Sequence, residues 1–101
     1  MIIYNITIKV DWSIAKDWIQ WMHETHIPDV LGTGCFEKHQ LVRLLQLDET
    51  EGPTYAIQYY AETLSKYDYY LQHYNTNIRQ KIKNRWGEKC VDFSTLMQVI
   101  E

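Results

Sequence analysis

The spacing of apolar residues in this 101-residue chain changes from two to about four and back, and then does so again. Strict alternation over the first ten residues gives one fully apolar face, which predicts a strand. From about residue 13 to 26 the apolar residues recur at helical spacing, which predicts an amphipathic helix. The alternating residues are Ile2, Tyr4, Ile6, Ile8 and Val10, and the helical ones are Ile14, Trp18, Trp21 and Met22.

Prolines and glycines mark the joints between the predicted elements. Pro28 is expected to end the first helix, because the residue before a proline avoids the α region. A second strand is predicted over residues 35–47, and its uneven alternation suggests a bulge. An acidic turn at 48–53 precedes a third, tyrosine-rich strand at 54–61, which indicates an antiparallel hairpin.

A second helical stripe covers residues 63–86, and a last strand is predicted over 91–100. Asn75, Thr76 and Asn77 are poor helix formers, so a kink or a break is expected there. Gly87 is a suitable residue to end the helix. The stripe consists of Leu64, Tyr67, Leu71, Tyr74, Ile78, Ile82 and Trp86.

The order strand–helix–strand–strand–helix–strand predicts an α+β fold, the ferredoxin-like βαββαβ plait, as one domain over residues 1–101. Both helices cover one face of the antiparallel sheet and leave the other face bare. The bare face is unusually poor in charge, so we expect a second copy of the chain to cover it in a homodimer. Its expected residues are Ile3, Asn5, Thr7, Lys9, Ala56, Gln58, Tyr60, Ser94, Leu96, Gln98 and Ile100.

Ten basic and thirteen acidic residues give a net charge of −3. This balance argues against nucleic acid and against an acidic membrane as partners. No targeting segment or membrane span is recognised, which favours a cytoplasmic location. Cys35 and Cys90 are expected at opposite edges of the sheet, too far apart to pair within one chain, so both should be free thiols.

Several aromatic and polar side chains could line a ligand pocket between the sheet and the helices. An apolar cavity with a few polar tips suits a small planar ligand, whereas the same residues equally suit plain core packing. Arg43 interrupts an apolar strand, so it either faces an anionic ligand or lies on the solvent side. The candidate pocket residues are Trp18, Met22, His26, Arg43, Tyr59, Tyr67 and Trp86.

The histidines do not make a convincing metal site. His23 and His26 are three residues apart, one short of the zinc motif HExxH, and with His39 they would supply few ligands. We therefore expect no metal and no cofactor. His26 should matter more than His23, because it lies where the chain turns toward the second strand.

A basic cluster near the end of the second helix could meet phosphates. A solvated helix face, with cations complementing the helix dipole, is the simpler interpretation. The cluster consists of Arg79, Lys81, Lys83, Arg85 and Lys89.

Runs of residues along the whole chain resemble a family of small proteins known only as a domain of unknown function. That family is similar to the dimeric α/β barrel proteins, which include cofactor-free monooxygenases, stress-responsive proteins and lactone isomerases. The resemblance implies the fold and a dimer but no activity. The segments that carry it include His26-Ile27-Pro28, Thr33-Gly34-Cys35-Phe36, Gly52-Pro53-Thr54-Tyr55, Tyr70-Leu71 and Phe93-Ser94-Thr95-Leu96-Met97.

Three functions remain open. The first is a dimeric α/β barrel protein of unassigned role that binds a small apolar or aromatic ligand between the sheet and the helices. The second is an enzyme of the cofactor-free monooxygenase or isomerase type, with His26 as acid or base and Arg43 as an anion clamp. The third is an interaction module whose basic helix end contacts a protein partner.

Overall fold

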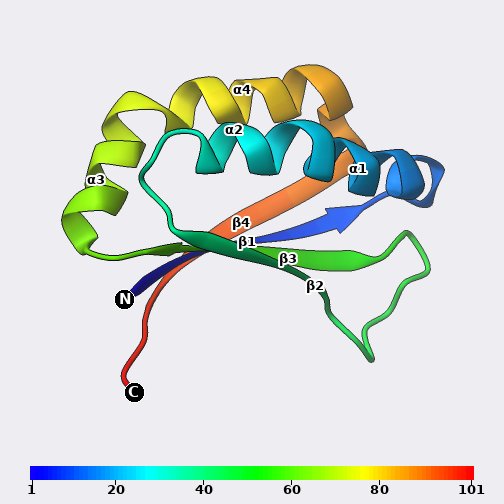
Figure 1. The fold of residues 1–101 in the computed structure, drawn as a ribbon. Coiled ribbons are helices and arrows are strands. Elements are labelled where there is room, and N and C mark those ends of the chain that lie inside the picture. The colour runs from blue at the N-terminus through cyan, green and yellow to red at the C-terminus, as the bar shows by residue number, and fades with distance from the viewer.

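A four-stranded antiparallel sheet carries a layer of helices on one face (Figure 1) in the computed structural model, which describes residues 1–101. The strand order is β2-β3-β1-β4, so β1 and β3 are central and the other two strands are edges. This arrangement confirms the predicted ferredoxin-like fold. The strands are β1 (Ile2–Val10), β2 (Lys38–Arg43), β3 (Thr54–Ala61) and β4 (Cys90–Gln98).

The first helix does not end at Pro28, contrary to the prediction. A 3₁₀ turn (Trp12–Ile14) leads into α1 (Ala15–Trp21), a π-helical turn (Met22–His26) and then α2 (Ile27–Leu31). Pro28 lies in the first turn of α2, directly after the π-helical turn, so its missing N–H falls at the junction of two helical segments, where a proline is tolerated. The π-helical turn therefore lets the helix restart without a break in direction.

The second helical stripe breaks at Tyr74, one residue before the expected segment. Tyr74 has φ −128° and separates α3 (Leu64–His73) from α4 (Asn75–Trp86). The Thr63 hydroxyl caps α3 by accepting from the Lys66 N–H. The buried residue of α3 is Tyr70, which lies outside the predicted stripe, whereas Leu64 and Leu71 are exposed.

The second strand is shorter than predicted and has no bulge. Its six residues pair in unbroken register with β3, and the leucines at 44, 45 and 47 belong to the following loop. The uneven alternation of apolar residues over 35–47 therefore arises because loop residues follow the strand directly. Gly52 in this loop packs so closely on the end of β1 that an added Cβ would lie 1.7 Å from the Val10 carbonyl oxygen.

The residues that face away from the helices differ from those predicted on β4. Asn5 pairs with Thr95 and Thr7 with Phe93, whereas Ser94 lies opposite Ile6, whose side chain points toward the helices. The predicted placement of Ser94, Leu96 and Gln98 on the bare face is therefore wrong, and Ile100 lies beyond the end of β4. From β4 the free sheet face receives Val91, Phe93, Thr95 and Met97.

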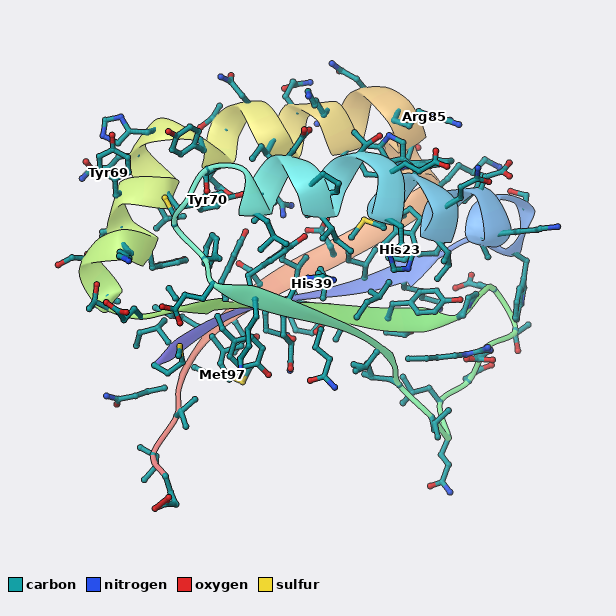
Figure 2. All side chains as sticks on the ribbon, in the orientation of Figure 1. His23, His39, Tyr69, Tyr70, Arg85 and Met97 are labelled. Atoms are coloured by element: carbon teal, nitrogen blue, oxygen red, sulfur yellow. The ribbon has the colours of Figure 1, made fainter.

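The free sheet face remains poor in charge after this correction. Lys9 and Lys38 are its only charged residues, and Phe93 is 63% exposed. Figure 2 shows Met97 on this side, and Figure 1 shows the β2–β3 loop and the C-terminal tail projecting from the same side. The remaining residues of the face are Ile3, Asn5, Thr7, Thr54, Ala56, Gln58, Tyr60, Gln40 and Val42.

The main core lies between the sheet and the helices. β1 contributes four side chains that are at most 2% exposed, and these are Tyr4, Ile6, Ile8 and Val10. Both cysteines are free thiols, with Cys35 buried and Cys90 partly buried. None of the helices is long and apolar enough to cross a membrane.

Candidate functional site

Helix α1 and the π-helical turn lie over β3 with their side chains in matched positions. The Trp18 ring stacks on Tyr55 with centroids 5.2 Å apart, and His26 Nδ1 shares a 2.8 Å hydrogen bond with the Tyr59 hydroxyl. The eight-residue step from Trp18 to His26 and the four-residue step from Tyr55 to Tyr59 both cover about 12–13 Å. Both contacts can therefore form at the same time. Met22 lies between Trp18 and His26 on the same buried helix face.

The pair of His26 and Tyr59 is sealed from solvent, at 2% and 0% exposure. Burial lowers the pKa of His26 to about 4, and the nearby Asp29 opposes this only in part. Burial also raises the pKa of Tyr59 far above its ordinary value. Both groups are therefore neutral near pH 7 and joined to each other, which describes a structural hydrogen bond rather than a poised acid or base.

Two other predicted pocket residues, Tyr67 and Trp86, pack against aromatic side chains. Tyr67 is partly buried with its ring 5.4 Å from that of Tyr4, and Trp86 packs edge-on against Trp21 at 5.9 Å. The indole Nε1 of Trp86 is buried without a hydrogen-bond partner.

Arg43, the last of the predicted pocket residues, lies away from the other six. Its guanidinium pairs with the Glu49 carboxylate at 2.6 Å and lies over the Trp12 ring in the β2–β3 loop region. None of the seven predicted pocket residues lines a cavity of the structure.

An open groove lies elsewhere in the same layer, between α4 and β4. Its volume is about 510 Å³, and its walls are mostly polar. We refer to it as the α4–β4 groove. It is lined by Asn75, Thr76, Arg79, Gln80, Ile82, Lys83, Gly87, Cys90 and Asp92.

Arg79 is the charged centre of the α4–β4 groove. Its Nη2 donates to Asp92 Oδ1 at 2.5 Å, across the gap between helix and strand. Burial opposes the charge and would lower the pKa of Arg79, but the hydrogen bond and the charge of Asp92, together with the Tyr4 hydroxyl, outweigh it and raise the pKa. Next to it, the Tyr4 hydroxyl donates to Asn75 Oδ1 at 3.3 Å. The Arg79 guanidinium is thus held in place while its side chain stays 37% exposed.

Cys90 lines the same groove but is not an activated nucleophile. Burial raises the pKa of its thiol, and the Asp92 carboxylate adds to that rise. The thiol is therefore protonated near neutral pH. Sequence analysis singled out Arg79 only as one of a basic cluster and did not connect it with Asp92, the one charged residue between Cys90 and Ile100.

The histidines lie apart from one another. Figure 2 shows His23 in the π-helical turn and His39 on β2, and both are exposed while His26 is buried. No group of three His, Cys, Asp or Glu side chains is close enough to hold a metal ion. The chemistry available in the helix–sheet layer is therefore hydrogen bonding and charge, concentrated at Arg79.

Solved structures with the same fold cover almost the whole chain. An ethyl tert-butyl ether d (EthD) family protein from Bacillus halodurans has a TM-score of 0.71 at 10% identity, over 99% of this chain and 100% of its own. The heme-degrader MhuD from Mycobacterium tuberculosis gives 0.67 at 14% identity, over 100% and 97%. A dimeric ferredoxin-like protein from an uncultured marine organism gives 0.60 at 10% identity, over 99% and 95%. At these identities the similarity establishes the fold alone.

Comparison of sequences identifies the family of this chain, which the structural similarities alone do not. No curated protein matches the chain in sequence. The model of one family, described as Domain of unknown function (DUF4286), matches residues 1–100. With nearly every residue matched and the fold as expected, the chain belongs to this family of unknown function.

Proposed function

We propose that this protein is a homodimer that binds a small molecule in the α4–β4 groove. The observation that carries the proposal is Arg79, which lines the groove with its guanidinium fixed by Asp92 while its side chain is 37% exposed. A charged donor held at the wall of an open cavity is what a ligand site needs for orientation. The ligand expected near Trp18 and His26 has no comparable space, because those side chains fill the layer.

Binding is favoured over catalysis by the groups that the groove offers. Its thiol is protonated, and its one carboxylate is engaged with Arg79. Neither group is free to act as nucleophile or base. The heme-degrading neighbour shares the fold at 14% identity, which supports a similar shape but not a similar reaction.

Dimerisation through the free sheet face is supported by its composition. Val91 and Phe93 are 70% and 63% exposed, and only two lysines carry charge on this face. Such a face is unusual for a monomer and normal for an interface. One structural neighbour is itself described as a dimeric ferredoxin-like protein.

A fragment screen read by protein NMR tests the ligand site. Thr76→Trp should fill the α4–β4 groove from its rim without replacing Arg79, because Thr76 lines the groove and is exposed. Fragments that bind should perturb residues 75–92 and should be excluded by this variant. Gln72→Trp, an exposed position on α3 that lines no cavity, is the control and should keep binding. Fragments that bind Thr76→Trp as well as the parent protein would place the site elsewhere.

Sedimentation velocity tests the dimer. Phe93→Asp puts a charge on the free sheet face and should convert a dimer to a monomer at micromolar concentration. Leu71→Asp changes an exposed apolar residue in the helix layer and should leave the dimer intact. A parent protein that sediments as a monomer at micromolar concentration would contradict this part of the proposal.

A further inference from the structure

The groups in the α4–β4 groove are dominated by hydrogen-bond donors. Asn75, Arg79 and Lys83 follow one another at intervals of four residues, so they lie along one face of α4. Tyr4 donates to Asn75 Oδ1, which turns the amide so that its Nδ2 donors remain available. From these observations, and resting on the proposed function, we infer that the ligand is a small organic carboxylate held by Arg79.

Arg79 has donors to spare. A guanidinium carries five N–H donors, and the bond to Asp92 Oδ1 uses one of them. Asp92 is only 12% exposed, so it acts as a fixed anchor that aims the guanidinium. A planar fork with free N–H groups matches the two oxygens of a carboxylate, which it binds with two parallel hydrogen bonds.

The charge of the groove favours an anion. Arg79 and Lys83 carry two positive charges against the single negative charge of Asp92. The groove is thus positive in a chain whose net charge is −3. A cationic ligand would have to compete with Arg79 for Asp92, whereas an anion meets a cation that is already in position.

The length and floor of the groove favour an organic body over an inorganic ion. Asn75 and Lys83 are about 12 Å apart along the helix axis, from the rise per residue. Ile82 and Cys90 add less polar surface to the lining. A ligand with a carboxylate at Arg79 and an apolar body along this wall would use both features.

Calorimetric titrations of the unmodified protein with benzoate, benzamide, benzylamine and inorganic phosphate test the inference. The first three probes share one ring and differ in charge. Benzoate should bind, and benzamide should bind about tenfold more weakly, because a charge-assisted hydrogen bond is replaced by neutral ones. Benzylamine and phosphate should bind more weakly than benzoate. Raising the salt concentration should weaken benzoate binding and leave benzamide binding unchanged.

Variants then assign the recognition to one side chain. Arg79→Gln should lower benzoate affinity about tenfold, and Arg79→Lys should restore it only in part, because the charge returns without the fork. Arg85→Gln is the matched control, since Arg85 lies over the Trp86 ring and does not line the groove. If either Arg79 variant fails to fold, the probe series on the parent protein still decides whether the groove prefers a carboxylate. Lys83→Gln, which removes the other positive charge of the groove, then tests whether that preference depends on the charge of the groove.

The outcomes separate this inference from the proposed function. Equal binding of benzoate and benzamide, or tighter binding of benzylamine, would overturn the carboxylate while leaving a ligand site in the groove. Binding of phosphate without benzoate would also overturn it, in favour of an inorganic or phosphorylated anion. If no fragment of any charge perturbs residues 75–92, the proposed function itself fails.

Discussion

Two parts of the helix–sheet layer hold polar groups in opposite ways. Under α1 and the π-helical turn, His26 and Tyr59 are neutral, joined to each other and sealed from solvent. Under α4, Arg79 and Asp92 are charged and joined to each other but open to a groove. In both places the pairing satisfies the groups, so a paired polar contact alone does not identify a functional site. What distinguishes the two is access for a third molecule.

The difference has a structural cause in the sizes of the side chains. The closed part is packed with rings, since Trp18 stacks on Tyr55 and Phe36 lies 5.5 Å from Tyr59. The open part faces the edge strand β4, whose side chains in the groove, Cys90 and Asp92, are short or polar. Packing therefore closes one site and leaves the other exposed, and four experiments probe that contrast.

The largest expected effect is in the closed part. Trp18→Ala should lower the free energy of unfolding by about 3–5 kcal/mol, because it removes a large, fully buried ring and leaves a cavity. Trp12→Ala, at a tryptophan that is 51% exposed, should cost about 1 kcal/mol or less. Chemical denaturation measures both. Similar losses for the two variants would mean that the region around Trp18 is not closed.

A smaller effect is expected from the buried hydrogen bond. Tyr59→Phe keeps the ring but leaves His26 Nδ1 without its partner, which should cost about 1–3 kcal/mol. Tyr60→Phe is the neighbouring control, because its hydroxyl makes a 3.3 Å bond to Gln58 on the free sheet face. That control should cost about 1 kcal/mol or less. Equal stability of Tyr59→Phe and the parent protein would contradict the sealed pair.

The pH dependence of stability should reveal the same pair. The unfolded chain takes up a proton at His26 near the ordinary pKa of 6.5, whereas the folded chain resists it down to about 4. The stabilisation is complete above pH 6.5 and is lost as the pH falls toward 4, by about 1.4 kcal/mol for each pH unit within that window. Denaturation at pH 6.5 and 5.5 measures it. His26→Gln should flatten this dependence and His23→Gln should not, and an unchanged slope in His26→Gln would refute the assignment.

The smallest effect on stability is expected in the open part. Asp92→Asn weakens the ion pair with Arg79, and because the Arg79 side chain is 37% exposed, solvent screens the loss to about 1 kcal/mol or less. Thermal unfolding of Asp92→Asn and of the surface variant Glu62→Gln should therefore differ little. A loss above about 3 kcal/mol would place Asp92 among buried ion pairs instead of at an open groove.

The central strands could be predicted from sequence because each buries one face completely. The alternation of β1 survives in the structure, and β3 has the predicted bounds. On the edge strand β4 the more apolar residues point away from the helices, and these are Val91, Phe93 and Met97. The rule that the apolar face of a strand packs on the core therefore assigns the wrong face of β4. Sequence pattern cannot distinguish an interface from a core there.

The candidate site was predicted in part for a similar reason. Trp18, Met22 and His26 recur every four residues, so their shared burial follows from helical spacing. Whether they enclose space depends on side-chain volumes, which a pattern does not contain. Arg79 and Asp92 are 13 residues apart on different elements, and each alone resembles an ordinary surface charge. Only the fold brings them together.

The π-helical turn also sets how the family can change in length. Its Ile27 N–H bonds to the Met22 carbonyl five residues back, so the helix contains one residue more than a regular α-helix of the same height. Deleting a single residue from this turn would restore regular winding but rotate one half of the helix by about 100° against the other. Trp18 and His26 could then no longer face β3 together. Chains of this family that gain or lose residues should therefore do so in the β2–β3 loop near the exposed Leu45, away from Gly52 and from the loop residues that contact Trp12.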